Sequence, residues 1–165
     1  MIRTKRLAAC SLVTAFCVVV MLLGALAELG MYAAPLAAAI ALMPIGAKYG
    51  VKYHLLAWLA VSLLSLILVP NAEQNLLFLG IVGWYPVIRP RLQRRPKMLR
   101  LLLKLLLFNA VLLAVEAVVM LVLGGELLGP WLMILFLLLM NILLFVFDRL
   151  IPIAEILLRR LLPYL

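Results

Sequence analysis

The stretch IRPRLQRRPKMLRLLLK, residues 88–104, places a dense run of bases between two long apolar segments. Its seven basic residues are Arg89, Arg91, Arg94, Arg95, Lys97, Arg100 and Lys104. Hydrophobic residues make up 69% of the whole chain. Because basic loops are retained on the cytoplasmic side during membrane insertion, this pattern is typical of an inner loop of an integral membrane protein.

Acidic and basic turns alternate along the rest of the chain. The turns around Glu28, Glu73 and Glu126 carry acids without Lys or Arg, whereas those around Arg3, Lys48, Arg91 and Arg149 carry bases. The same retention of basic loops predicts that both termini are cytoplasmic and that the number of membrane crossings is even.

The length of 165 residues accommodates about six spans of ~20 residues with short turns, in one polytopic membrane domain over residues 1–165. We therefore predict an all-α protein, a six-transmembrane-helix bundle. Its spans are expected at about 6–27, 31–43, 51–69, 72–88, 97–123 and 131–147. The second helix is short, because Pro44 and Gly46 follow it. Residues 148–165 mix bases with Ile and Leu, which predicts an amphipathic helix in the inner interface.

The N-terminal apolar run differs from a secretory signal. It continues from Leu7 to about Ala27 and meets Glu28 rather than a small-x-small cleavage site. We expect it to be retained as the first helix.

The composition disfavours several classes of function. The net charge of +9 comes from bases at span ends, where they meet anionic lipid headgroups, so we expect no nucleic-acid partner. The headgroup contacts are expected at Arg89, Arg91, Arg94, Arg95 and Lys97. With one histidine, no Gly-rich phosphate loop and no cluster of His, Asp and Glu, the chain is expected to be neither an enzyme nor a metal or cofactor protein.

We expect His54, Cys10 and Cys17 to have structural rather than chemical roles. His54 lies near Lys48 and Lys52, so an interfacial, headgroup-contacting position is favoured over a functional one. Cys10 and Cys17 are seven residues apart in the first span, with no His or acid nearby. They are interpreted as small apolar fillers rather than a disulfide or metal site.

Polar groups inside the spans are the main candidates for a binding pocket, since an unpaired polar group in hydrocarbon is costly. Asn109 and Glu116 share one face of the fifth segment, and Asn141 lies at a depth similar to Asn109 in the sixth. The fourth segment adds Glu73, Gln74 and Asn75 at its outer tip and Trp84 deeper in the membrane. Such a mostly apolar site with a few polar groups is typical of a small-molecule pocket. The alternative for the two asparagines is a set of hydrogen bonds that only hold helices together.

Small residues recur at helical spacing in the first two segments. Ser11 and Ala15 form one ridge, and Ala33, Ala37 and Ala41 form another. Ridges of this kind allow close approach of helix backbones. They pack either within the protein or against a second membrane protein, and the sequence leaves both alternatives open.

These features together resemble a known class. Six spans, inner termini, a short second helix after an acidic turn and alanine spacing look like the substrate-binding S component of energy-coupling-factor (ECF) vitamin transporters. The segments 46–52, 68–73, 83–88 and 102–109 in particular resemble uncharacterised bacterial membrane proteins of that general kind. The resemblance covers most of the chain and rests on the arrangement of the spans and on short sequence motifs of low specificity.

The resemblance implies a function. The protein would lie in the bacterial plasma membrane and capture a vitamin-like micronutrient from outside with its fourth to sixth helices. It would associate through its first three helices with a transmembrane coupling subunit driven by two cytoplasmic ATPases. It would have no ATPase activity of its own, in keeping with the missing phosphate-binding loop.

A rival hypothesis comes from another class of protein. A non-transporting membrane scaffold, for instance a partner in envelope assembly or cell-shape maintenance, would share the topology and use its polar groups for packing only. A proton- or ion-coupled channel is disfavoured, since no polar stripe crosses the bilayer.

Overall fold

The computed structural model describes residues 2–27, 30–124 and 129–161, and every regular element in these ranges is helical. The elements are α1 (Ile2–Leu26), α2 (Gly30–Tyr49), α3 (Val51–Leu68), α4 (Ala72–Leu77), the π-helix η1 (Phe78–Val82), α5 (Tyr85–Gln93), α6 (Lys97–Leu123) and α7 (Pro130–Leu161). The all-α class predicted from the sequence is confirmed for this part of the chain. The expected acidic turns at Glu28 and Glu126 lie outside the described residues.

Five of these helices, α1, α2, α3, α6 and α7, are long and apolar enough to cross a membrane. This indicates a multi-pass membrane protein. The prediction that the second helix is short is wrong, because α2 runs for 20 residues through both Pro35 and Pro44. The first proline lies early in α2, and Pro44 is followed by a final turn that ends at Tyr49, so neither stops the helix. α2 also continues through Gly46 and ends before Gly50, whose φ of 93° favours a residue without a side chain.

The segment expected as the fourth span is divided into α4, η1 and α5. Pro86 is the second residue of α5, where its missing N–H leaves no intrahelical bond unmade. The N–H of Gly83 instead bonds to the carbonyl of Phe78 at 3.0 Å, which closes the wider π-turn. Gly80 brings η1 against α6, since a Cβ at this position would lie 2.8 Å from Val111. The interruption thus follows from a proline and two glycines within seven residues.

The last helix is longer than expected. α7 is one continuous helix of 32 residues, and Asp148, where the interfacial tail was predicted to begin, lies inside it. Pro152 is accommodated within the helix. The sequence from 148 to 161 therefore extends the sixth predicted span without a break, and residues 162–165 lie outside the described part.

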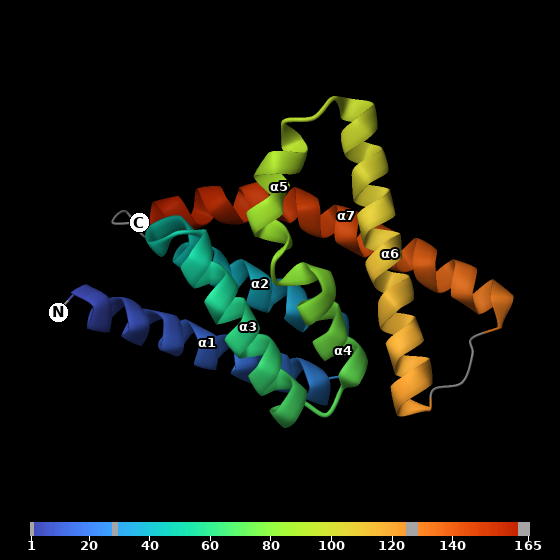
Figure 1. The fold of residues 1–165 in the computed structure, drawn as a ribbon, viewed down its shortest axis with the longest axis horizontal. Helices are drawn as coiled ribbons and strands as arrows, with labels where there is room; N and C mark the ends of the chain where they lie inside the picture. Colours follow the sequence, from blue (N-terminus) through green and yellow to red (C-terminus); the bar gives the residue numbers. More distant parts are fainter. Residues whose placement is uncertain (1, 28–29, 125–128, 162–165) are drawn as a thin grey trace.

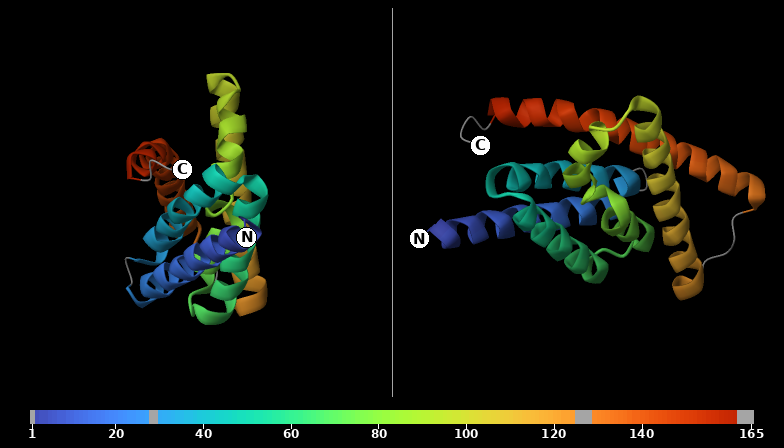
Figure 2. Two further views of the ribbon diagram at one scale, coloured as in Figure 1. Left: turned by 90° about the vertical axis from the view of Figure 1, so that its left-hand side faces the viewer. Right: turned by 45° about the horizontal axis from the view of Figure 1, so that its top comes forward.

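The helices do not run parallel to one another. α1, α2 and α3 pack against each other, while α6 runs across the direction of α2 and crosses α7 (Figures 1 and 2). η1 and α5 lie between these two groups (Figure 1). Much of α6 and of the first half of α7 is exposed and apolar, as a surface facing lipid tails is expected to be.

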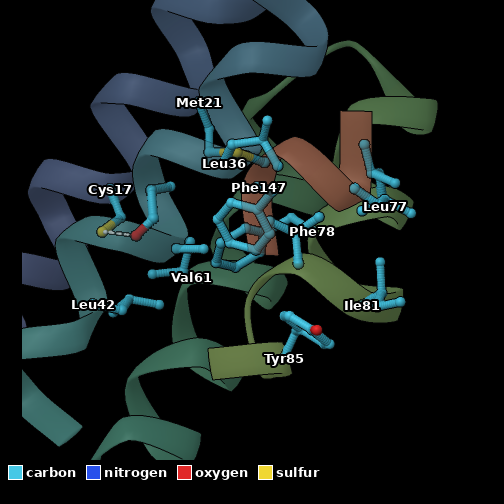
Figure 3. Close-up of a cluster of buried hydrophobic side chains, with 14 of the residues drawn as sticks. Cys17, Met21, Leu36, Leu42, Val61, Leu77, Phe78, Ile81, Tyr85 and Phe147 are labelled. Atoms are coloured by element: carbon cyan, nitrogen blue, oxygen red, sulfur yellow. Dashed lines mark hydrogen bonds between the residues drawn. The ribbon is translucent and has the colours of Figure 1, made fainter. Parts of the chain in front are cut away.

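The core lies where the two groups of helices meet. Cys17 and Met21 of α1, Leu36 and Leu42 of α2, and Val61 of α3 surround one side of it (Figure 3). Phe78 and Ile81 of η1, Tyr85 of α5 and Phe147 of α7 fill the other side (Figure 3). Phe147 joins α7 to this core one residue before Asp148.

Candidate functional site

Asp148 is the centre of a buried ionic network that connects three helices. Its Oδ1 accepts hydrogen bonds from Tyr85 Oη at 2.6 Å and from Arg89 Nε at 3.0 Å, both on α5. Its Oδ2 accepts a hydrogen bond from Lys104 Nζ on α6. All four side chains are at least nine-tenths buried. We call Tyr85, Arg89, Lys104 and Asp148 the inner network.

Two aromatic rings pack against Tyr85 of the inner network. Tyr85 packs edge-on against Phe108 at 5.3 Å between ring centroids and lies 6.2 Å from Phe147. A carboxylate in such surroundings is stable only when its charge is matched and its lone pairs are used. Asp148 meets both requirements with three donors.

The sequence did not predict the inner network. Arg89 is predicted to contact headgroups, and the structure adds a partner that the sequence did not predict: its side chain is 9% exposed and bonds to Asp148. Lys104 is one of the seven bases of the predicted inner loop, and Asp148 is the first residue of the predicted interfacial helix. Arg91, Arg94, Arg95 and Lys97 are exposed, as headgroup contact requires. One signal for the network is present in the sequence. Asp148 is a single acid that directly follows the apolar run 131–147, at the end of that span expected to lie on the same side of the membrane as the basic loop.

His54 is also placed differently from the prediction. The expected interfacial position is wrong, because the residue is 1% exposed. Its Nδ1 lies 3.2 Å from the carbonyl oxygen of Leu42, and its Nε2 lies 3.0 Å from that of Gly83. His54 thereby connects α2 and α3 to the break between η1 and α5, which is a structural role.

Two of the candidate pocket residues on α4 form bonds inside the protein. Gln74 donates from Nε2 to the Met21 carbonyl oxygen at 2.7 Å. Asn75 donates to the carbonyl oxygens of Ser65 and Val69 at 3.1 and 2.9 Å, which fixes the turn between α3 and α4. The side-chain carbonyl oxygens Oε1 of Gln74 and Oδ1 of Asn75 are buried without a partner among the described residues.

The third candidate on α4, Glu73, faces a different neighbourhood. Its Oε2 accepts a hydrogen bond from Tyr32 Oη of α2 at 3.4 Å. Glu116 lies on α6, which packs against α4, and its partly exposed side chain is near Tyr32 and Glu73 without a hydrogen bond to either. We call Tyr32, Glu73 and Glu116 the acidic end. It brings together three helices at the end of α6 remote from the basic loop.

Trp84 does not join the acidic end. Its indole Nε1 donates to the carbonyl oxygen of Gly80 at 2.8 Å, within its own segment. The ring is partly buried beside the break that separates η1 from α5.

Asn109 and Asn141 pair with each other across the contact between α6 and α7. Asn141 Nδ2 donates to Asn109 Oδ1 at 2.9 Å, and Asn109 Nδ2 donates to Asn141 Oδ1 at 3.3 Å. Each amide also donates to a carbonyl oxygen four residues earlier in its own helix. This is the interhelical bonding that the sequence left as an alternative to a pocket.

We expect Asn109→Leu and Asn141→Leu each to lower the thermal stability of the protein in detergent, because either change removes the bonds between the two helices and leaves the Oδ1 of the other asparagine without its donor. The double variant should be more stable than the sum of the two single losses predicts, with a coupling of roughly 1 kcal/mol. A double-mutant cycle from thermal unfolding measures this coupling. Additive losses would contradict the pairing.

The predicted ridges of small residues lie mostly on the surface. Ser11, Ala15, Ala33 and Ala37 are exposed, and Ala41 is partly buried. The contact between α1 and α2 uses neighbouring positions instead. Gly24 lies against Ala34, and the Cys17 thiol donates to the Ala38 carbonyl oxygen at 3.4 Å. The surface ridges therefore remain available to lipid or to another protein.

Neither the inner network nor the acidic end has the ligands of a metal centre among the described residues. No three His, Cys, Asp or Glu side chains there lie together in a way that could hold a metal ion. No family model, curated protein or solved structure matches this chain.

Proposed function

We propose that this protein is the small-molecule-binding membrane subunit of an ECF-type uptake transporter, with the acidic end as its substrate site. The observation that carries the proposal is the convergence of Tyr32, Glu73 and Glu116 from three helices at one end of the molecule. Polar groups that converge at a mostly apolar surface are typical of ligand sites. The substrate would be a vitamin-like micronutrient.

The chemistry of the acidic end favours one class of substrate group. Two carboxylates and a phenol offer hydrogen-bond acceptors and negative charge, so they suit a ligand with a cationic or donor-rich group. Gln74 and Asn75 are not part of this site, since their amides bond toward α1 and the turn between α3 and α4. Asn109, Asn141 and Trp84 are left out of this site, since their polar groups are used within the protein.

The proposal includes six crossings of the bacterial plasma membrane with both termini inside. α4, η1 and α5 together cover residues 72–93 and would form an interrupted sixth crossing of ~33 Å at ~1.5 Å per residue. Broken helices are tolerated at membrane depth where protein surrounds them. The acidic end then faces outward, and the basic loop faces the cytoplasm.

The partner in this proposal is a transmembrane coupling subunit that two cytoplasmic ATPases drive. The exposed ridge of Ala33 and Ala37 on α2, with Ser11 and Ala15 on α1, supports it, because a surface of small residues permits close helix packing. The substrate would have to bind more tightly to the subunit that is docked on its partner than to the free subunit, since equal affinity for both states would not change the equilibrium between them.

The first test is to purify the protein in mild detergent from cells grown in rich medium and to release any bound small molecule in native mass spectrometry. We expect a stoichiometric metabolite. Calorimetry with that compound should then show a loss of affinity of about tenfold or more in Glu73→Gln and Glu116→Gln, as expected when a charged hydrogen bond is lost. The charge-matched control is Glu155→Gln. Glu155 is an exposed acid near the C-terminal end of α7, outside the acidic end, so this variant should bind the compound as the wild type does.

The scaffold hypothesis remains the second candidate, because Gln74, Asn75, Asn109 and Asn141 all take part in internal bonds. A scaffold needs its polar groups only for such packing. It would co-purify with other membrane proteins and carry lipid alone. Equal affinity of Glu73→Gln, Glu116→Gln and the wild type for every recovered metabolite would favour it over the receptor.

A further inference from the structure

We propose that Arg89 and Lys104 form a discrete binding site for a phosphate group, either of a lipid headgroup or of a soluble phosphate compound. The site lies at the basic-loop end of the molecule, remote from the acidic end, and goes beyond the proposed transport function. Its outer edge is formed by Gln93, the last residue of α5.

The charge of the inner network carries the proposal. Arg89 and Lys104 contribute two positive charges, whereas Asp148 contributes one negative charge. Asp148 is the sole carboxylate that pairs with either cation in the described part of the chain. A net positive charge buried inside a protein is costly unless an anion compensates it. A phosphate oxygen would supply the missing charge.

The donors of the network also exceed the acceptors. A lysine ammonium carries three N–H groups, and Asp148 takes one of those of Lys104. No further hydrogen bond of this side chain exists among the described residues, although it is 7% exposed. Arg89 gives its Nε to Asp148, and its two terminal nitrogens meet no acceptor among the described residues except the side-chain amide of Gln93.

Gln93 occupies the position at which a phosphate would enter. With the amide oriented so that its oxygen faces Arg89, this oxygen lies 2.6 Å from Nη2 and 3.1 Å from Nη1. The two terminal nitrogens of an arginine are suited to two oxygens of one phosphate. The neutral, exposed amide of Gln93 thus stands in for an anionic oxygen and can be displaced from the surface.

Neighbouring bases would raise the local concentration of anions around the site without forming it. Arg91, Arg94, Arg95 and Lys97 are exposed on the same loop. Their attraction to an anionic surface is diffuse and is screened by salt. Arg89 and Lys104 are desolvated, so their interaction with a phosphate is local and stronger.

Gln93→Glu provides a test that keeps the fold intact, since the residue is exposed. The new carboxylate would pair with Arg89 and neutralise the network from within the chain, so phosphate binding should weaken by about tenfold or more. Arg94→Gln changes the net charge by the same amount outside the site and should weaken binding less than about twofold. Gln93→Ala removes the displaceable amide and should bind at least as tightly as the wild type.

Binding would be measured by native mass spectrometry of the detergent-solubilised protein, titrated separately with dioleoylphosphatidylglycerol, with dioleoylphosphatidylcholine and with glycerol 3-phosphate. One tightly retained phosphatidylglycerol that Gln93→Glu loses and Arg94→Gln keeps identifies a lipid headgroup site. The same pattern with glycerol 3-phosphate identifies a site for soluble phosphates. Equal weakening in Gln93→Glu and Arg94→Gln, or no retained adduct from any probe, overturns the proposal.

Discussion

Asp148→Ala should destabilise this protein more than any other single change to its polar side chains. The substitution leaves Arg89 and Lys104 as unpaired buried cations and removes the acceptor of Tyr85. Breaking a buried ion pair in this way costs roughly 3–5 kcal/mol. Thermal unfolding in detergent should show a fall in melting temperature of about 10 °C for a chain of this size.

Glu155→Ala is the matched control, because Glu155 is an exposed acid two turns further along α7. Its stability should stay within about 0.5 kcal/mol of the wild type. Adding Lys104→Met to Asp148→Ala should recover part of the lost stability, since one of the two unpaired cations is then absent. A further, additive loss in the double variant would show that the carboxylate does not stabilise the cations.

Gly24→Val should cause the second large loss, by disrupting the contact of α1 with α2. A Cβ at position 24 would lie 2.2 Å from the Cβ of Ala34 and 2.9 Å from the backbone oxygen of Gly30. Neither atom can move without the helix that carries it. Overpacking of this kind typically costs about 1–3 kcal/mol, and a β-branched residue at a backbone contact should reach the upper end.

The same substitution at Gly129 is the control for this prediction, because a Cβ there meets no atom within 4 Å. Gly129→Val should change the melting temperature little. Combining Gly24→Val with Ala34→Gly removes the nearer of the two clashing atoms and should restore part of the stability. If Gly24→Val and Gly129→Val unfold at the same temperature, α1 and α2 do not approach as closely as described.

The sequence was sufficient to predict the helical class and the approximate position of most long helices. Hydrophobic runs bounded by charges and by Gly or Pro mark helices regardless of tertiary contacts. The prediction for α2 was wrong because Pro44 was treated as an end, whereas the helix accommodates it and continues to Tyr49. Whether a proline stops or only perturbs a helix depends on the packing around it, which local sequence does not specify.

The candidate sites were harder to predict, for a different reason. Asn109 and Asn141 were correctly placed at one depth, but whether they pair or line a cavity depends on the distance between α6 and α7. The role of Asp148 could not be predicted, because its three partners are 44, 59 and 63 residues away in the chain. Glu73 and Glu116 were singled out as candidates, while Tyr32 was not, since a tyrosine near a helix end is ordinarily an interfacial anchor.

The unbroken course of α7 has a mechanical consequence. A rigid helix of 32 residues is ~48 Å long at ~1.5 Å per residue, and it crosses α6 where Asn141 meets Asn109. About that contact, any change of tilt moves the two arms of α7 in opposite directions. If α7 tilts as one body while α5 and α6 keep their places, a displacement of the arm near Trp131 shifts Asp148 relative to Arg89 and Lys104. Such a lever would let an event at one face of the membrane alter the ionic contacts near the other.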